Sequence, residues 1–387
     1  MPLFKCTSPG CLQSGVRRHG SCRLCNSHLC TKHLRQNFHH CPDWRVRLCI
    51  PVKSILLSYT IPQVNEQLEE YDIKSAEAEI AEMTALLSKV NVSALRDRAT
   101  ALRKVDCTVP ALSYDHESRF SVMGGMNYHI PIHFVDGVTW LCRIRRRNIT
   151  TTPVAHQNRL ILSEAATYQF LSSRTLIPVP KVHDYSIDSP FNPIGVGYIL
   201  IMDKLEGKPL SDCDLTDADR ERVLSQLADV FVALKQHPFN EIGCLLDPDN
   251  LSVGPVLDES TIVDADEDGN LSLLGPFKSA LEYRTSSIKH QIELILRGEC
   301  YNSNAIDAYL IHRFILDHVI QSVTEKEQGP FFLKHMDDKG DHILVDDKFR
   351  IVGIIDWEWG SDYYPVGGVR RPPLSPGRTR PILQWIK

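Results

Sequence analysis

Apolar and polar positions repeat with a helical period in the first third of the chain. In residues 63–105, apolar side chains recur at spacings of three and four, namely at Ile80, Met83, Leu87 and Val90. This spacing predicts one long helix whose apolar face packs against the domain that follows it. The intervening acids predict a solvated face: Glu66, Glu69, Glu70, Glu77, Glu79 and Glu82. A partner-binding helix is the alternative reading of the same pattern.

From residue 113 onward the pattern changes to short extended runs. HIPIHF and VTWLCRIR flank the turn Val135-Asp136-Gly137, and Asp-Gly is a strong hairpin signal. In the second run, residues 139, 141, 143 and 145 share one face, whereas Arg146 is expected to face solvent. A turn with two glycines precedes the hairpin, and its backbone N–H groups could approach a phosphate, which makes candidates of Gly124, Gly125 and Asn127. A plain hairpin turn explains the same residues.

Helical and strand patterns then alternate to the end of the chain. Helices are predicted at about residues 158–171, 286–297 and 305–324, and a buried strand begins at residue 198. Thr216 is a predicted N-cap, and the helix after it has a predicted core face made of Val223, Leu227, Val230, Phe231 and Leu234.

The stretch from residue 331 to 359 brings two acids together. Apolar runs at residues 343–345 and 351–355 flank the polar turn 346–348, which predicts a second hairpin. Asp337 precedes this hairpin and Asp356 follows it, so both are expected at one end of a small sheet. Two acids so placed could serve as a base and a divalent-metal ligand in phosphoryl transfer. A solvated acidic turn is the alternative.

Composition is ordinary for a globular protein, but charge and cysteine are unevenly distributed. The 387 residues are 43% hydrophobic and 24% charged. The sequence has neither an apolar run of membrane-spanning length nor the apolar core of a signal peptide, so we expect a cytoplasmic protein without a membrane contact. The net charge is −5, yet residues 1–50 hold eight Lys or Arg against one acid, which predicts a basic module on an acidic body.

The first fifty residues also hold seven of the twelve cysteines. Eight potential ligands occur in close pairs, as two tetrahedral zinc sites require: Cys6, Cys11, Cys22, Cys25, Cys30, His33, His39 and Cys41. A segment this short has too little core to fold alone, so metal would supply its folding energy. Disulfides and an unstructured basic tail are the alternatives, and a reducing compartment argues against disulfides.

The array from Cys22 to Cys41 resembles the AN-one type zinc finger, although the first pair has four intervening residues where two are usual. The resemblance implies two cross-braced ions, one held by Cys6, Cys11, Cys30 and His33, the other by Cys22, Cys25, His39 and Cys41. It implies a protein-interaction module more than a reader of nucleic acid. The helical linker is expected to separate this module from the core of the next domain.

His335-Met336-Asp337 and Ile355-Asp356-Trp357 resemble the catalytic loop and metal-binding aspartate of aminoglycoside-phosphotransferase-like kinases, most closely their fungal branch. The resemblance implies an α+β, two-lobed, protein-kinase-like fold. It makes Asp337 the catalytic base, Asp356 the magnesium ligand and Arg143 the phosphate-contacting cation, with Glu164 as the partner of that cation. Arg145 would replace Arg143 if the register slips by one pair.

One residue departs from this family. Its asparagine, a second metal ligand, falls on His342, and imidazole prefers softer metals than magnesium. Asp341 or Asp338 could substitute, in which case His342 packs under the loop. With His342 as ligand, we expect weak activity with magnesium and better activity with manganese.

The sequence therefore predicts five segments: a zinc-finger module (1–50), an apolar connector and helical linker (51–110), an N-terminal lobe (111–205), a C-terminal lobe that is short for the family (206–365), and an irregular or disordered tail (366–387). The expected function is ATP- and magnesium- (or manganese-) dependent phosphoryl transfer to a hydroxyl of a small molecule. The alternative is a catalytically impaired pseudokinase that acts as a zinc-dependent protein-interaction protein. Nucleic-acid binding by the basic finger is a weaker possibility.

Overall fold

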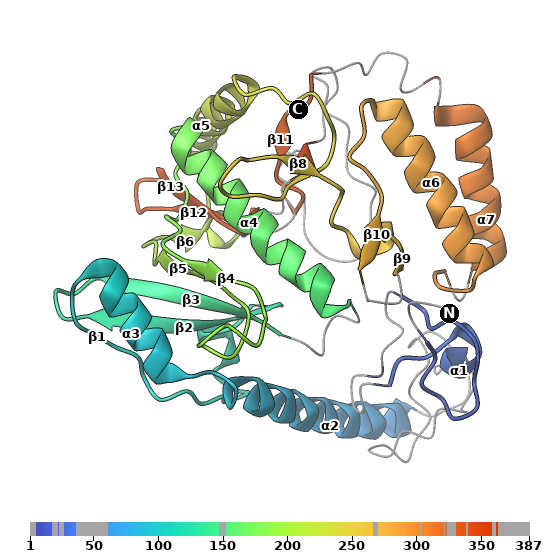
Figure 1. Ribbon diagram of the computed structural model, residues 1–387, viewed down its shortest axis with the longest axis horizontal. Helices are drawn as coiled ribbons and strands as arrows, with labels where there is room; N and C mark the ends of the chain where they lie inside the picture. The colour runs from blue at the N-terminus through green and yellow to red at the C-terminus, as the bar shows by residue number, and fades with distance from the viewer. Residues whose placement is uncertain are drawn as a thin grey trace.

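The computed structural model describes residues 5–362, apart from gaps at 18–21, 23–26, 36–60, 125, 147–151, 266–269, 302–303, 321, 323–329, 338–339 and 358–360. Within these ranges every strand pairing is antiparallel, and helices flank the sheets, which agrees with the expected α+β class (Figure 1). The predicted tail at 366–387 lies outside the described residues, as do Gly125, Cys25, His39 and Cys41.

The largest sheet has five strands in the order β1-β2-β3-β5-β4. Their bounds are β1 Cys107–Thr108, β2 Asn127–Phe134, β3 Thr139–Arg145, β4 Tyr185–Ser186 and β5 Tyr198–Asp203. The predicted hairpin joins β2 to β3, and its Gly137 has a φ of 88°, which is why the turn needs glycine there. Alternating side chains of β2 and β3 fill the core under the sheet, including Ile130, Ile132 and Cys142.

The predicted long helix is two helices, α2 (Ile61–Leu87) and α3 (Val92–Arg103). The break occurs because Asn91 takes an extended conformation and its side chain caps α3 by accepting the Ala94 N–H. Met83 and Leu87 pack into the core of the sheet as predicted, but Ile80 is exposed, so the apolar face is narrower than the spacing indicates.

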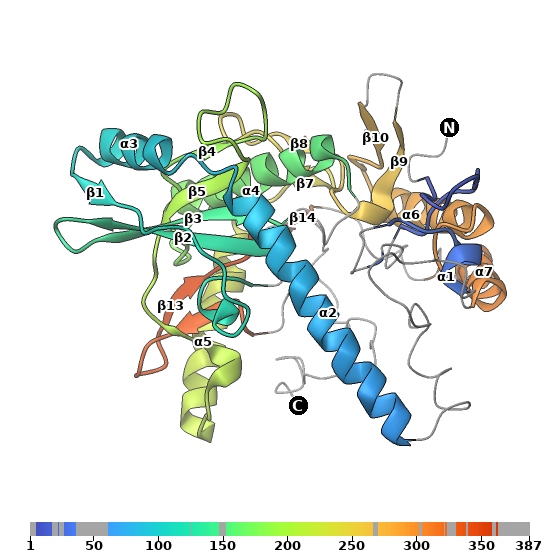
Figure 2. The same ribbon diagram turned by 90° about the horizontal axis from the view of Figure 1, so that it is seen from below.

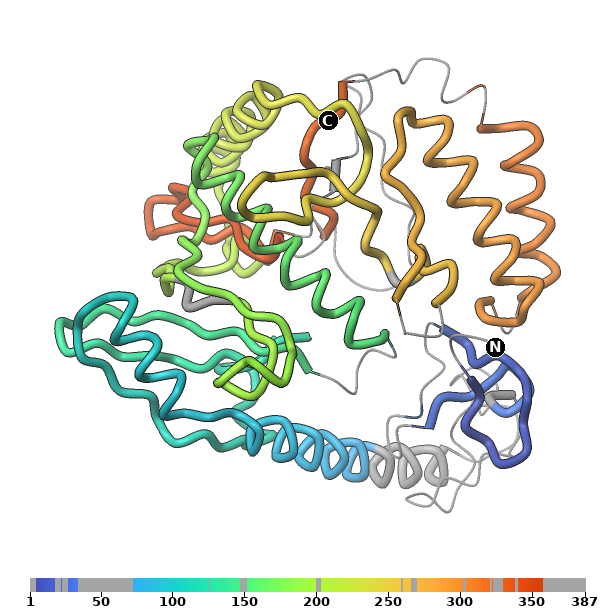
Figure 3. Tube along the Cα trace, viewed as in Figure 1, coloured from blue at the N-terminus to red at the C-terminus, as the bar shows by residue number. Residues whose placement is uncertain are grey.

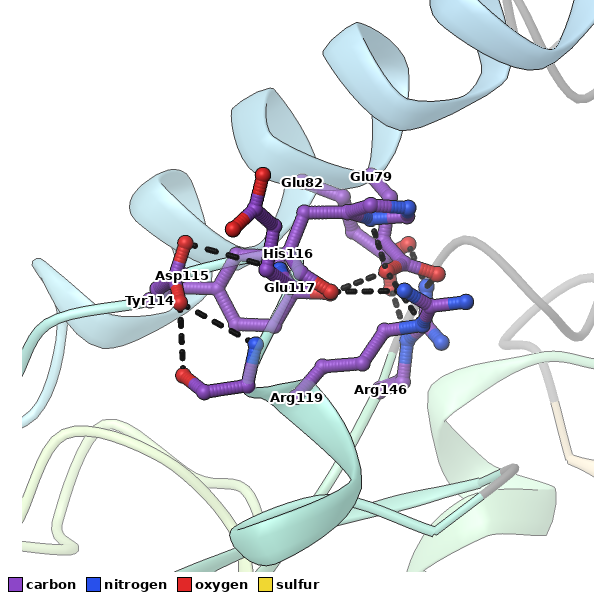
Figure 4. Close-up of polar contacts among 9 residues, drawn as sticks. Glu79, Glu82, Tyr114, Asp115, His116, Glu117, Arg119 and Arg146 are labelled. Atoms are coloured by element: carbon purple, nitrogen blue, oxygen red, sulfur yellow. Dashed lines mark hydrogen bonds and ion pairs between the residues drawn. The ribbon is translucent and has the colours of Figure 1, made fainter.

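The prediction that Glu79 and Glu82 belong to a solvated face of α2 is wrong. Arg146, predicted to face solvent, is buried and donates to Glu82 Oε2 at 2.6 Å (Figure 4). Glu79 in turn accepts from the hydroxyl of Tyr114 and lies 3.0 Å from His116 Nδ1. These pairs form because Arg146 follows β3 at the point where α2 passes, and buried charges need partners. The linker helix is thus fastened to the sheet.

Helix α4 (Val154–Arg174) lies between this sheet and the rest of the molecule (Figure 1). It is buried along most of its length, and it shares a core with Leu245, Ile354 and Trp357. Helix α5 (Asp217–Lys235) begins with the predicted Thr216 cap. Its predicted core face is wrong at Phe231, which is 61% exposed, because only the Val223 and Leu234 side of the helix is covered.

The other strands and α-helices of the described residues have the bounds β6 Lys208–Pro209, β7 Cys244–Leu245, β8 Val253–Gly254, β9 Ile262–Ala265, β10 Leu271–Leu273, α6 Ala280–Leu296, α7 Ala305–Phe314, β11 Leu333–Lys334, β12 Ile343–Val345, β13 Ile351–Ile354 and β14 Ser361–Asp362. The predicted second hairpin is β12–β13, and β6 extends it on the β12 side. A second small sheet has the order β11-β14-β7-β8, and β9 pairs with β10.

The N-terminal segment, with the short helix α1 (Thr31–Arg35), does not stand apart from the body. Figures 2 and 3 show this segment beside the ends of α6 and α7 and away from the five-stranded sheet. The apolar core of the module, made of Cys6, Val16, Leu29 and Cys30, is distinct from the other cores of the described residues. The expected separation is nevertheless incomplete, because Arg17 and Thr31 contact the body.

Among the described residues, no helix combines the length and the apolar character that crossing a membrane requires.

The Arg146–Glu82 pair gives a test of how firmly α2 is attached. Arg146→Met should lower the free energy of unfolding by about 3 kcal/mol, because it leaves Glu82 buried without its cation. The matched control is Glu77→Gln on the same helix, whose pair with Lys74 is exposed and should contribute little. Urea denaturation measures both, and equal effects of the two variants would contradict a buried attachment.

Candidate active site

Three charged side chains from separate elements meet where the sheet, α4 and the second hairpin converge. Arg143 of β3 forms a buried ion pair with Glu164 of α4, and the two side chains are 5% and 0% exposed. The other arm of the guanidinium, Nη2, lies 3.3 Å from Asp356 Oδ1. The expected Arg143–Glu164 pairing is present.

Burial dominates the electrostatics of this cluster. It raises the pKa of Glu164, which Arg143 opposes and Asp356 reinforces. Burial acts to lower the pKa of Arg143, but the neighbouring carboxylates outweigh it and raise the pKa. The second Glu164 oxygen, Oε2, is buried and has no hydrogen-bond partner among the described residues. Arg143 is therefore a fixed cation that faces one buried and one half-exposed acid.

Asp356 occupies a strained backbone position. Its φ is 61°, a left-handed conformation that costs a residue other than glycine about 1–3 kcal/mol. The Asp356 N–H donates to the hydroxyl of Tyr168 at 3.1 Å, and Tyr168 is fully buried on α4. Because Glu164 and Tyr168 are four residues apart, they share a face of α4. One helix thus fixes both the strand cation and the backbone of Asp356.

The loop that carries Asp337 is fastened to the strand end that carries Asp356. His335 Nε2 lies 2.9 Å from the Ile355 carbonyl oxygen, and the Ile355 N–H donates to the His342 carbonyl. The side chain of Asp337 is half-buried, whereas that of Asp356 is 55% exposed. The structure therefore places the two aspartates on adjoining loops, as the hairpin pattern predicts.

His342 packs beneath this loop. Its side chain is buried, its ring stacks on His335 with centroids 4.1 Å apart, and its Nδ1 accepts the Gly340 N–H at 3.3 Å. Asp341 is exposed and its Oδ1 lies 3.8 Å from His342 Nδ1. Asp338, the other candidate substitute, lies outside the described residues.

In the turn before β2, one of the backbone N–H groups that could bind a phosphate is already hydrogen-bonded within the turn. The Gly124 N–H donates to the Asn127 carbonyl, so it closes the turn. Asn127 is buried and borders a cavity of ≈ 10 Å³ with Arg143 and Arg145, which is room for about one water. Gly124 therefore closes a tight turn that leads into β2.

Two residues near the cluster escaped the sequence reading. Tyr168 could have been found from its four-residue spacing to Glu164 on the predicted helix. His129 lies opposite Arg143 in the β2–β3 register. Burial lowers the pKa of His129 to about 4, with Arg143 adding to the effect and Asp356 opposing it. The imidazole is thus neutral at pH 7 and adds no competing positive charge beside Arg143.

A second cluster lies in the N-terminal module. The ligand atoms of Cys6, Cys11, Cys30 and His33 all lie within 4.8 Å of one another. The Cys6 and Cys30 sulfurs are 3.3 and 3.2 Å from His33 Nδ1, and the Cys11 and Cys30 sulfurs are 3.9 Å apart. Ligands of a tetrahedral zinc ion stand about 3.5–3.8 Å apart, given its usual bond lengths.

This donor set fits zinc, and a sulfur separation of 3.9 Å is far beyond a disulfide bond. Of the other expected ligands, Cys22 is buried, and the remaining three lie outside the described residues.

The Tyr168 hydroxyl supports a direct test. Tyr168→Phe should speed hydrogen exchange of the Asp356 amide and lower stability by about 1 kcal/mol, because one hydrogen bond at a strained residue is lost. Tyr185→Phe, in the same core but on β4, is the matched control. If both variants exchange alike at residue 356, Tyr168 does not hold this backbone.

Comparison with known proteins places the chain in a family. The sequence profile of the phosphotransferase enzyme family matches residues 135–361, which is more than half of the chain. The sequence of this chain matches no curated protein. Solved structures that resemble it share low identity: an aminoglycoside phosphotransferase in ternary complex with ADP and hygromycin B (16% identity, 69% of this chain and 72% of that one, TM-score 0.37), a putative fructosamine-3-kinase from Thermobifida fusca (14%, 70% and 75%, 0.43) and a macrolide 2'-phosphotransferase from Brachybacterium faecium (16%, 70% and 73%, 0.37).

The profile match covers β3, α4 and the β12–β13 hairpin, the elements that carry Arg143, Glu164 and Asp356. The chain has the mixed α/β, kinase-like architecture of that family. This protein belongs to the phosphotransferase enzyme family.

Proposed function

We propose that this chain transfers a phosphoryl group from ATP to a hydroxyl of a small molecule, with magnesium or manganese as the metal. The observation that carries the proposal is the buried Arg143, held by Glu164 and in contact with Asp356. A phosphoryl-transfer site needs a fixed cation for phosphate oxygens, a hard oxygen ligand for the metal and a base near the acceptor. Arg143, Asp356 and Asp337 supply these three parts.

Each residue has a defined task in this proposal. Arg143 contacts phosphate oxygens through Nη2, the arm on the side of Asp356, while the bond of Nη1 to Glu164 holds the guanidinium in place. Asp356 offers a half-exposed carboxylate to the metal, which neutralises charge on the phosphates when bound. Asp337 accepts the proton of the acceptor hydroxyl while that oxygen bonds to the γ-phosphorus and the bond to the ADP oxygen breaks. The turn closed by Gly124 and Asn127 would lie over the phosphates in this proposal.

The family's second metal ligand is the weakest match. The Nδ1 of His342 is occupied by the Gly340 N–H and its ring is stacked in the loop, which supports a packing role. Asp341 is exposed beside it and carries the hard oxygen that magnesium prefers. We therefore assign the second ligand to Asp341 and retain His342 as the support of the loop.

A pseudokinase is the second candidate. Two observations favour it. His342 stands in place of the family's asparagine, and the Gly124 N–H donates to the Asn127 carbonyl within the turn rather than pointing toward a phosphate. Such a protein would bind nucleotide without turning it over. A phosphotransfer assay with a panel of hydroxylated small molecules separates the two.

The proposal also includes the domain boundaries predicted from the sequence, a relation to the fungal branch of the family, and an N-terminal zinc module. The Cys6, Cys11, Cys30 and His33 cluster supports the first ion. A second ion at Cys22, Cys25, His39 and Cys41 rests on the number of closely spaced ligands and on the resemblance to the zinc finger. Protein interaction is the proposed role of the module surface that the body leaves open.

Nucleotide binding tests the division of labour between the two aspartates. Asp356→Ala should abolish magnesium-dependent nucleotide binding, because the metal loses its carboxylate. Asp337→Asn should leave nucleotide affinity nearly unchanged and lower kcat by about 100-fold or more, since only the base is lost. Calorimetric titration with ATP and magnesium provides the affinity. Unaltered binding in both variants would show that this is not a nucleotide site.

Metal preference tests the assignment of the second ligand. Asp341→Ala should raise the magnesium concentration needed for half-maximal activity, whereas His342→Asn should change stability more than metal preference. Asp347→Ala, a fully exposed acid in the neighbouring hairpin turn, is the control for loss of charge. If only His342→Asn alters metal dependence, by raising magnesium-supported activity, then position 342 and not Asp341 is the metal ligand.

Zinc content tests the N-terminal module. Metal analysis of dialysed protein should return about two equivalents of zinc, as two tetrahedral sites require. Cys11→Ser should remove one equivalent, and Cys213→Ser, a half-buried cysteine outside the module, should remove none. Protein that holds no zinc and has mapped disulfides would disprove the module.

A further inference from the structure

The N-terminal module is joined to the body by a buried ion pair. Arg17 Nε donates to Glu299 Oε2 at 2.6 Å, and the two side chains are 3% and 2% exposed. The Arg17 backbone N–H donates to the Glu299 carbonyl at 2.7 Å, and its Nη1 donates to the carbonyl of Ile262 in β9. One arginine thus bonds the end of α6 and the start of β9 at once. Figures 1 and 2 agree that the module lies beside these elements.

A second contact lies next to the metal cluster. Thr31, which follows the ligand Cys30, donates its hydroxyl to the Gly298 carbonyl at 2.9 Å. Gly298 has a φ of 72° at the turn after α6, so the carbonyl that Thr31 reaches is fixed by a conformation that favours glycine. The contact surface and the ligand cluster therefore share one short piece of chain.

The cluster also determines where Arg17 stands. The Val16 N–H donates to the Leu29 carbonyl, which ties the residue before Arg17 to the residue before Cys30. The core of the module consists of Val16 and Leu29 with the cysteines Cys6 and Cys30, and Cys11 packs at its edge. A core of this size is too small to fold without a cross-link. An ion at the cluster would hold the two segments that present Arg17.

We propose that the docking partner of this module face is the chain's own C-terminal region, the turn after α6 with β9, and that metal binding and docking stabilise each other. An undocked body would leave Glu299 in a site that lacks its cation, and a metal-free module could not keep Arg17 in place. Coupling between two such events is reciprocal, so each must strengthen the other by the same factor. The Arg17 and Thr31 face is consequently closed to an outside partner.

The experiment measures both directions of the coupling in the full chain loaded with zinc. A chelator is added in steps, and alkylation of Cys6 and Cys30 is followed by mass spectrometry, which reports this cluster alone. Glu299→Gln should release the two cysteines at a chelator concentration lower by roughly tenfold, within the usual range of coupling between sites. Glu293→Gln makes the same chemical change at an exposed position of α6 and should match the unaltered protein.

The reverse direction uses hydrogen exchange of peptides that span residues 256–300. Chelation of the unaltered protein should increase exchange around Gly298 and Glu299 and leave the five-stranded sheet unaffected. If Glu299→Gln does not fold, Thr31→Val, which removes one contact at the edge of the face, should shift alkylation in the same direction by a smaller factor. Loss of either effect, in alkylation or in exchange, overturns the proposal. Neither readout involves phosphotransfer, so failure here is distinct from failure of the proposed function.

Discussion

The buried pair of Arg143 and Glu164 is the constraint around which the molecule is arranged. Both charges are out of water, and neither is stable there without the other, because an unpaired buried charge costs several kcal/mol. The sheet and α4 must therefore keep one relative position. Tyr168, one turn further along α4, extends the same constraint to the backbone of Asp356. The β12–β13 hairpin joins the arrangement through the shared core of Ile354 and Trp357.

The sequence predicts the parts of this arrangement whose signals are local. The hairpins β2–β3 and β12–β13 follow from alternating apolar residues around polar turns, and the Thr216 cap follows from its position before a helical pattern. It misses what depends on distant partners. Arg146 and Glu82 are 64 residues apart, so each reads locally as a solvated charge although together they are buried. The prediction that Phe231 is buried is wrong because helical periodicity identifies an apolar face but not whether another element covers it.

The N-terminal module shows the same division. Metal-ligand spacing is a local signal that marks eight candidate ligands in the sequence. The resemblance to the zinc finger groups Cys6, Cys11, Cys30 and His33 into one site, and the structure brings these four together. The attachment of the module depends on Arg17 and Glu299, which are 282 residues apart. No local sequence pattern predicts that these two residues form a pair. The linker helix α2 is itself held to the sheet by Glu82, and the module that precedes it contacts β9 and the turn after α6.

The most direct test of the account is whether nucleotide binding depends on Arg143 and not on its neighbour in the same strand. The double variant Arg143→Met, Glu164→Met replaces the buried pair with apolar side chains, an exchange that proteins often tolerate without loss of stability. Titration calorimetry with ATP and magnesium should find one site in the unaltered protein and in Arg145→Met, and none in the folded double variant. Binding that survives in the double variant, or that disappears only in Arg145→Met, would contradict the account.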